Sequence, residues 1–213
     1  MIALAIAAAA ATFDARAAKV VIHDTRCVTA PSQRVHDMMT DYEGYVKLPG
    51  AKYEMKIAHV GKLPLLTMVK SQSRYTARDA RETDAKVWVV LQPTNLTDAA
   101  YYPRFLLHCV SHHEGERNFT HTCALEAEKP HYGLDGFNST LEATADAPSC
   151  EKGQLRLEYT LTLTSNDSHV EEIKKKVVEP AGLLGPILAK LFNEETFFRG
   201  YYLNFYESAV QAL

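Results

Sequence analysis

Apolar and polar residues alternate along most of the chain, and this alternation predicts a series of antiparallel strands. The clearest case is residues 155–164, where threonine and charged side chains share one face. The opposite face carries Leu155, Leu157, Tyr159, Leu161 and Leu163. One buried face and one wet face are typical of antiparallel sheets. We expect further strands at residues 19–28, 53–60, 65–76, 86–91, 104–113, 118–127 and 137–145.

The last part of the chain changes to helical spacing. From Phe198 onward, apolar residues recur three or four positions apart. They are Tyr201, Tyr202, Phe205, Tyr206, Ala209, Val210 and Leu213. This stripe predicts a long helix with an aromatic face. Two starting points remain open, because Pro186 suits a first helical turn and Asn193 suits an N-cap.

The predicted order is a strand, a short helix pair that opens near Pro31, antiparallel strands and a long final helix, which is the order of the helix-grip fold. Residues 30–35, 41–45 and 48–50 resemble the opening of the START-like superfamily, which includes START lipid-transfer domains, Bet v 1-like proteins and polyketide cyclases. Residues 132–137 resemble its aromatic and glycine turn. The resemblance covers about residues 19–213. It implies an α+β fold in which a curved sheet of seven or eight strands grips the final helix.

The resemblance also implies an apolar cavity between the sheet and the helix. The expected ligand-binding residues are Met55, Met68, Trp88, Phe105, Leu107, Phe137, Leu157, Tyr159, Leu161, Phe198, Tyr201, Tyr202 and Phe205. Mostly apolar pockets bind small hydrophobic ligands, and a tyrosine can both pack against a ligand and orient its head group. The alternative is that these residues fill an ordinary core.

One predicted hairpin brings cysteine and histidine residues together. If residues 115–117 form its loop, Cys109 lies opposite Cys123, and His113 and His121 share their face. A cross-strand disulfide and a Cys₂His₂ metal site are both open interpretations. We favour the disulfide, and expect no bound metal, if the chain is exported.

A second disulfide is expected between Cys27 and Cys150. In the helix-grip sheet the first strand runs antiparallel to the last one, so the resemblance places the end of the first strand near the loop before the last. None of the four cysteines forms a Cys-x-x-Cys pair. A zinc ribbon and a thioredoxin-type motif are therefore not indicated.

The first residues have the pattern of a targeting segment. Residues 2–11 are an uninterrupted apolar run, and Ala15-Arg16-Ala17 fits a small-x-small cleavage site. We therefore expect a signal peptide at residues 1–17, a START-like ligand-binding domain at residues 18–213, and a secreted, periplasmic or lumenal location. The alternative is an alanine-rich helix at the start of a cytosolic protein.

Composition and motifs exclude several functions. The net charge is −3 and no basic block is present, so nucleic-acid binding has no electrostatic support. The chain lacks His-Glu-x-x-His, Gly-x-Ser-x-Gly and Gly-x-Gly-x-x-Gly motifs, so we expect no cofactor and no hydrolase or nucleotide enzyme. We expect a monomer that touches membranes transiently through its apolar residues 182–192.

The leading hypothesis is the binding or transfer of a hydrophobic, lipid-like small molecule without catalysis. A cyclase or aromatase on the same fold is the second hypothesis, in which a tyrosine, histidine or arginine in the cavity acts as acid or base. A protein-interaction module with a filled core is the third.

Overall fold

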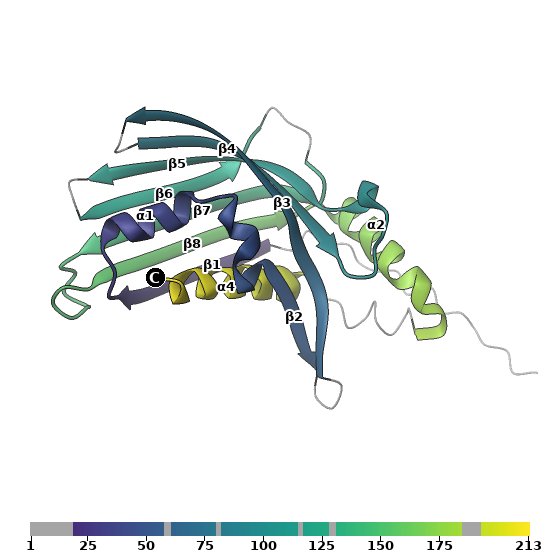
Figure 1. Cartoon of the computed structure of the whole chain (residues 1–213). Coiled ribbons are helices and arrows are strands. Elements are labelled where there is room, and N and C mark those ends of the chain that lie inside the picture. Colours follow the sequence, from purple (N-terminus) through teal and green to yellow (C-terminus); the bar gives the residue numbers. More distant parts are fainter. Residues whose placement is uncertain (1–18, 58–60, 80–81, 115–116, 128–130, 185–192) are drawn as a thin grey trace, which may run out of the picture.

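The computed structural model describes residues 19–57, 61–79, 82–114, 117–127, 131–184 and 193–213. Eight antiparallel strands form one sheet in the order β1-β8-β7-β6-β5-β4-β3-β2 (Figure 1). The strands are β1 (Lys19–Val28), β2 (Lys52–Ile57), β3 (Gly61–Asp79), β4 (Glu82–Pro93), β5 (Arg104–Glu114), β6 (Asn118–Leu125), β7 (Leu134–Ala145) and β8 (Leu155–Ser165).

Three α-helices accompany the sheet within the described part of the chain. They are α1 (Ser32–Thr40), α2 (Asp167–Val178) and α4 (Glu194–Gln211). Short 3₁₀ turns are η1 (Gly44–Lys47), η2 (Pro49–Ala51), η3 (Ala99–Tyr101) and η4 (Glu179–Leu184). The sheet curls around α4, and α1 lies on the same face, as Figure 1 shows. Helix α4 contacts β1, β2 and η2, whereas α1 packs against β6 and β7. Among the described residues, no helix is both long and apolar enough to span a membrane.

The observed N-terminus of α4 distinguishes between the two predicted starting points, Pro186 and Asn193. The side chain of Asn193 accepts a hydrogen bond of 2.9 Å from the backbone N–H of Thr196, which is the geometry of an N-cap. The helix therefore begins after Asn193. The region around Pro186 lies outside the described residues, as do the predicted signal peptide and most of the predicted membrane-contact segment.

The predicted strands match the observed ones with two corrections. Strand β3 begins at Gly61, before the predicted start at residue 65, so that Pro64 lies inside this strand, opposite Glu54. The strand tolerates it because the β2–β3 register shifts between Tyr53 and Glu54, and because β4 pairs with β3 only from Leu66 onward. Helix α2 was not predicted, and the lysines at 174–176 belong to it.

Both predicted disulfide pairings are confirmed. Cys27 and Cys150, with Cα atoms 5.6 Å apart, join the end of β1 to the loop before β8. Cys109 and Cys123, with Cα atoms 4.1 Å apart, join neighbouring positions of β5 and β6. Two bridges are typical of proteins from an oxidising, extracellular compartment.

Glycine is needed where the backbone of η2 meets α4. A Cβ atom on Gly50 would lie 2.3 Å from the carbonyl oxygen of Asn204 and 2.3 Å from the Cα atom of Phe205. No other residue type fits this distance without moving one of the two segments. The contact holds α4 close to the β2 side of the sheet.

Candidate functional site: an aromatic cavity beneath the C-terminal helix

A cavity lies between α4, the segment around α1 and the inner face of the middle strands. The centres of water-sized spheres can occupy about 80 Å³ of it. Because one water needs roughly 10–15 Å³ by this measure, the space is larger than a packing defect. The lining residues are Met39, Tyr42, Tyr45, Met68, Val87, Val89, Phe105, Leu107, Cys109, His121, Cys123, Phe137, Ser139, Leu141, Tyr159, Tyr201, Tyr202, Phe205, Tyr206 and Ala209.

Most of the predicted ligand-binding residues meet at this cavity. Those that line it are Met68, Phe105, Leu107, Phe137, Tyr159, Tyr201, Tyr202 and Phe205. Leu157, Leu161 and Phe198 are instead buried in the core away from the cavity wall. Met55 lies in β2 opposite Leu63, but its side chain lies outside the described residues.

The prediction for Trp88 was wrong. Val87, Val89 and Leu91 are buried on the inner face of β4, whereas Trp88 between them is only partly buried. Successive side chains of a strand point to opposite faces, so Trp88 faces away from the cavity.

Several lining residues were missed by the sequence analysis. Tyr42 and Tyr45 come from the segment after α1, where the hydroxyl of Tyr45 donates a hydrogen bond to the carbonyl oxygen of Met39. Ser139 and Leu141 come from the inner face of β7. The period-two pattern of β7, counted from Phe137, was the signal that could have found the last two.

The cavity wall is rich in aromatic rings that pack on one another. The rings of Tyr159 and Tyr206 are stacked, with centroids 4.6 Å apart and planes 11° apart. Phe137 contacts Tyr202 with centroids 5.6 Å apart. These contacts tie β8 and β7 to α4 and give the cavity flat apolar walls.

Two tyrosines of α4 that line the cavity also carry buried hydroxyl groups. The hydroxyls of Tyr201 and Tyr206 are buried, and neither has a hydrogen-bond partner among the described residues. Burial raises the pKa of Tyr206 to about 12 and also raises the pKa of Tyr201. Both hydroxyls therefore stay protonated at physiological pH and can donate a hydrogen bond to a guest.

His121 is a deeply buried ionisable group of the cavity wall, with 2% of its surface exposed. Its Nδ1 atom lies 2.8 Å from Ser111 Oγ, and its Nε2 atom lies 3.3 Å from Cys123 Sγ. Burial lowers its pKa to about 4, and repulsion from His36 acts in the same direction. The imidazole is therefore neutral at pH 7.

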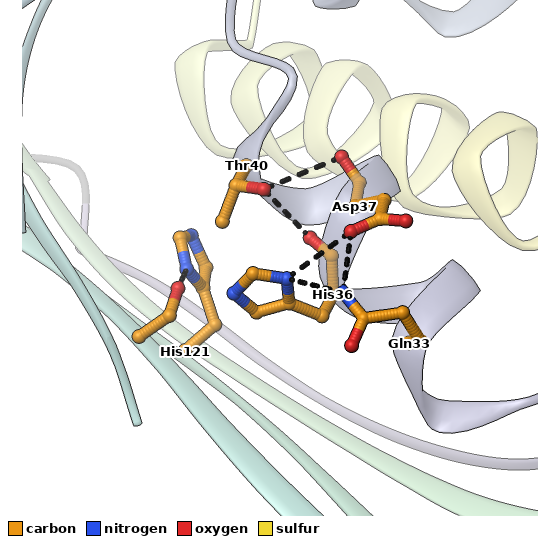
Figure 2. Close-up of polar contacts among 6 residues, drawn as sticks. Gln33, His36, Asp37, Thr40 and His121 are labelled. Carbon is orange, nitrogen blue, oxygen red and sulfur yellow. Dashed lines mark hydrogen bonds and ion pairs between the residues drawn. The ribbon is translucent and has the colours of Figure 1, made fainter. Parts of the chain in front are cut away.

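His36 approaches this group from α1. Figure 2 shows its ring turned toward His121. Its Nδ1 atom lies 3.4 Å from Asp37 Oδ1, and its Nε2 atom is buried without a hydrogen-bond partner among the described residues. The ring centroid of His113 lies 4.4 Å away. Three histidines thus meet between α1 and the β5–β6 hairpin.

No family model and no curated protein sequence matches the chain. A norcoclaurine synthase from Thalictrum flavum is similar in structure, with 12% identity over 92% of this chain and 87% of that one and a TM-score of 0.39. The Zhui aromatase/cyclase from Streptomyces sp. R1128 has 9% identity over 92% and 97%, with a TM-score of 0.42.

A third similar structure is a START superfamily protein from Mycobacterium smegmatis. It has 12% identity over 81% of this chain and 99% of that one, with a TM-score of 0.36. With its curled eight-stranded antiparallel sheet around a C-terminal helix, the chain has the α+β helix-grip fold.

Proposed function

We propose that this protein binds a hydrophobic, lipid-like small molecule in the cavity beneath α4, and that it carries this molecule outside the cytosol. One observation supports the proposal most directly. The centre of the domain is not filled, although mostly apolar side chains from the six strands β3 to β8 and from α4 surround it. A hydrophobic guest removes this wall from water, which is favourable at about 25 cal/mol per Å² of apolar surface.

The polar groups of the wall suit a guest with an oxygen atom at one end. Burying a hydroxyl without a partner costs free energy, which a ligand oxygen recovers by accepting its proton. Tyr201 and Tyr206 offer two such hydroxyls. A fatty acid, sterol, quinone or similar molecule combines the required apolar body with such an atom.

The experiment begins with the organic extract of the natively purified protein, examined by mass spectrometry. Delipidated protein is then titrated with a fluorescent fatty acid, a fluorescent sterol, a short-chain quinone and a labelled phospholipid. We expect saturable binding of one molecule per chain for at least one of them. The absence of saturable binding across this panel would refute the proposal.

A pair of alanines on α4 supplies a matched test of the site. Ala209 is 3% exposed and lines the cavity, whereas Ala212 is exposed at the C-cap. Ala209→Leu places new atoms in the cavity and should weaken binding at least tenfold. Ala212→Leu should leave binding unchanged, and equal affinities of the two variants would place the ligand elsewhere.

A cyclase-type activity is the second candidate function, because a neutral histidine stands on the cavity wall. Efficient general bases have pKa values near the working pH, and a pKa of about 4 makes His121 a weak base at pH 7. We therefore rank binding above catalysis. The ranking would be reversed if the protein converted a bound polyketone, and if His121→Gln abolished this turnover while ligand affinity was retained.

A further inference from the structure

Two cysteines and one histidine form a compact cluster on the cavity wall. The sulfur atoms of Cys109 and Cys123 and one ring nitrogen of His121 all lie within 4.8 Å of one another. All three residues are buried, and all three line the cavity. Among the described residues, they form the one group of three or more potential ligands that meets this distance.

We infer that reduction of the Cys109–Cys123 bridge converts this cluster into a Cys₂His site for a zinc-class divalent ion. The structure shows the oxidised form, in which the two sulfurs are bonded to each other. Two thiolates and an imidazole nitrogen are ligands that zinc prefers, and three protein ligands leave a fourth position open. Because the cluster lines the cavity, that position faces the space proposed for the guest.

The surroundings of His121 already suit a metal ligand. Its Nδ1 atom is held 2.8 Å from Ser111 Oγ, which is fully buried, so the ring cannot rotate freely. A proton on Nδ1, donated to that oxygen, leaves the lone pair on Nε2, and Nε2 lies 3.3 Å from Cys123 Sγ. A hydrogen bond that fixes the second ring nitrogen is the usual support of metal-bound histidines.

A neighbouring side chain carries a buried polar atom without a partner in the described part of the chain. His36 is 6% exposed, and its Nε2 atom has no hydrogen-bond partner among the described residues. Figure 2 shows this ring turned toward His121. A buried polar atom without a partner calls for a water or an ion that satisfies it.

The other half of the predicted Cys₂His₂ set is not part of the cluster. His113 lies near His36, at the end of the hairpin, and its ring nitrogens do not lie within 4.8 Å of all the other ligand atoms. The inferred site therefore has one histidine.

A dithiol reductant supplies the two electrons that reduce the Cys109–Cys123 bridge. A dithiol attacks one sulfur of the bridge, forms a mixed disulfide and then closes to its own disulfide, leaving Cys109 and Cys123 as two thiols. Metal binding then releases the two thiol protons. The bridge spans only 14 positions of one hairpin, and the paired strands β5 and β6 hold the cysteines opposite each other without it.

Cobalt(II) titration of the full chain tests the inference, because thiolate-bound cobalt has a characteristic charge-transfer absorption. The probe protein is Cys27→Ser/Cys150→Ser, reduced with a phosphine, in which only the cavity cysteines remain. We expect one tetrahedral cobalt per chain after reduction, none before it, and displacement by zinc. His121→Gln should weaken cobalt binding at least tenfold and shift the visible bands, because a nitrogen ligand is lost.

The matched control is Cys109→Ala/Cys123→Ala, which keeps the other cysteine pair. Near-ultraviolet circular dichroism of each sample reports whether the reduced chain retains its tertiary structure. The absence of cobalt–thiolate absorption in the folded, reduced probe protein would overturn the inference, and so would equal absorption in the control. Loss of tertiary structure on reduction that cobalt does not restore would overturn it as well.

Discussion

The two disulfides differ greatly in the length of chain that they close, and this difference predicts their separate contributions to stability. Cys27–Cys150 has a sequence separation of 123, and Cys109–Cys123 has one of 14. A bridge stabilises a fold mainly by restricting the unfolded chain, and this effect grows with the logarithm of the loop length. The chain-entropy relation gives about 5 kcal/mol for the long loop and about 3 kcal/mol for the short one.

Each bridge can be measured alone, because the oxidised and reduced forms of one and the same variant are compared. Cys109→Ala/Cys123→Ala keeps the long-range bridge, and Cys27→Ser/Cys150→Ser keeps the hairpin bridge. Each variant is unfolded with urea in its oxidised and its phosphine-reduced form, and the difference in free energy of unfolding belongs to the one bridge it holds. At about 2–4 °C per kcal/mol for a domain of this size, reduction should lower Tm by roughly 10–20 °C and 6–12 °C respectively.

The order of the two losses is the decisive result. Reduction of the variant that keeps Cys27–Cys150 should cost about 2 kcal/mol more than reduction of the other. An equal or smaller loss would show that the unfolded chain is already restrained across this span, and the entropic argument would fail.

Three further predictions concern single residues. Gly50→Ala should destabilise the domain by about 1–3 kcal/mol in urea unfolding, because its Cβ has no room beside α4, whereas Gly136→Ala, whose Cβ would make ordinary contacts, should cost less. His121 has a folded pKa of about 4 and an ordinary pKa of 6.5. Its neutral, buried form therefore adds up to about 3 kcal/mol to the free energy of unfolding, fully above pH 6.5 and progressively less as the pH falls toward 4. The free energy of unfolding, measured with urea at several pH values, should therefore decrease below pH 6.5, and His121→Gln should reduce this decrease. Tyr201→Phe should leave the free energy of unfolding of the ligand-free protein equal or higher, because the buried hydroxyl has no partner among the described residues. It should lower the binding affinity roughly threefold to tenfold, and only for ligands that carry an oxygen atom. An equal loss of affinity for a pure hydrocarbon would contradict the role of the hydroxyl.

Much of the sheet could be predicted from the sequence, because burial on one face imposes a two-residue period. Strand β8 was expected at residues 155–164 and observed as Leu155–Ser165. The register of the β5–β6 hairpin was also predictable, since a short loop leaves few ways to place Cys109 opposite Cys123. The long final helix followed from its aromatic stripe.

The errors have physical causes in particular residues. Residues 87–91 are apolar at every position, so alternation could not show that Trp88 faces outward. Helix α2 was missed because charged residues surround its short apolar stripe. That stripe includes Val170 and Ile173, and Ile173 packs on Leu96 and Tyr102 in a small separate cluster.

The distinction between lining a cavity and filling a core was not available from the sequence. Leu157 and Tyr159 share one face of β8, yet only Tyr159 borders the cavity. The difference depends on how far the sheet curls and on where α4 crosses it. Both are tertiary properties to which many small contacts contribute.

The position of α4 explains why the cavity stays open. The backbone of α4 comes closest to β1 and β2, which are the two edges of the sheet, while side chains from β3 to β8 line the cavity between those edges. On one side Arg26 of β1 pairs with Glu207 of α4 at 3.2 Å, and on the other Gly50 of η2 touches the backbone at Phe205. A helix held at both edges of a curled sheet cannot settle onto its middle. We therefore expect Gly50→Ala, which pushes α4 away from η2, to speed ligand dissociation in a stopped-flow displacement assay, although Gly50 is not part of the cavity wall.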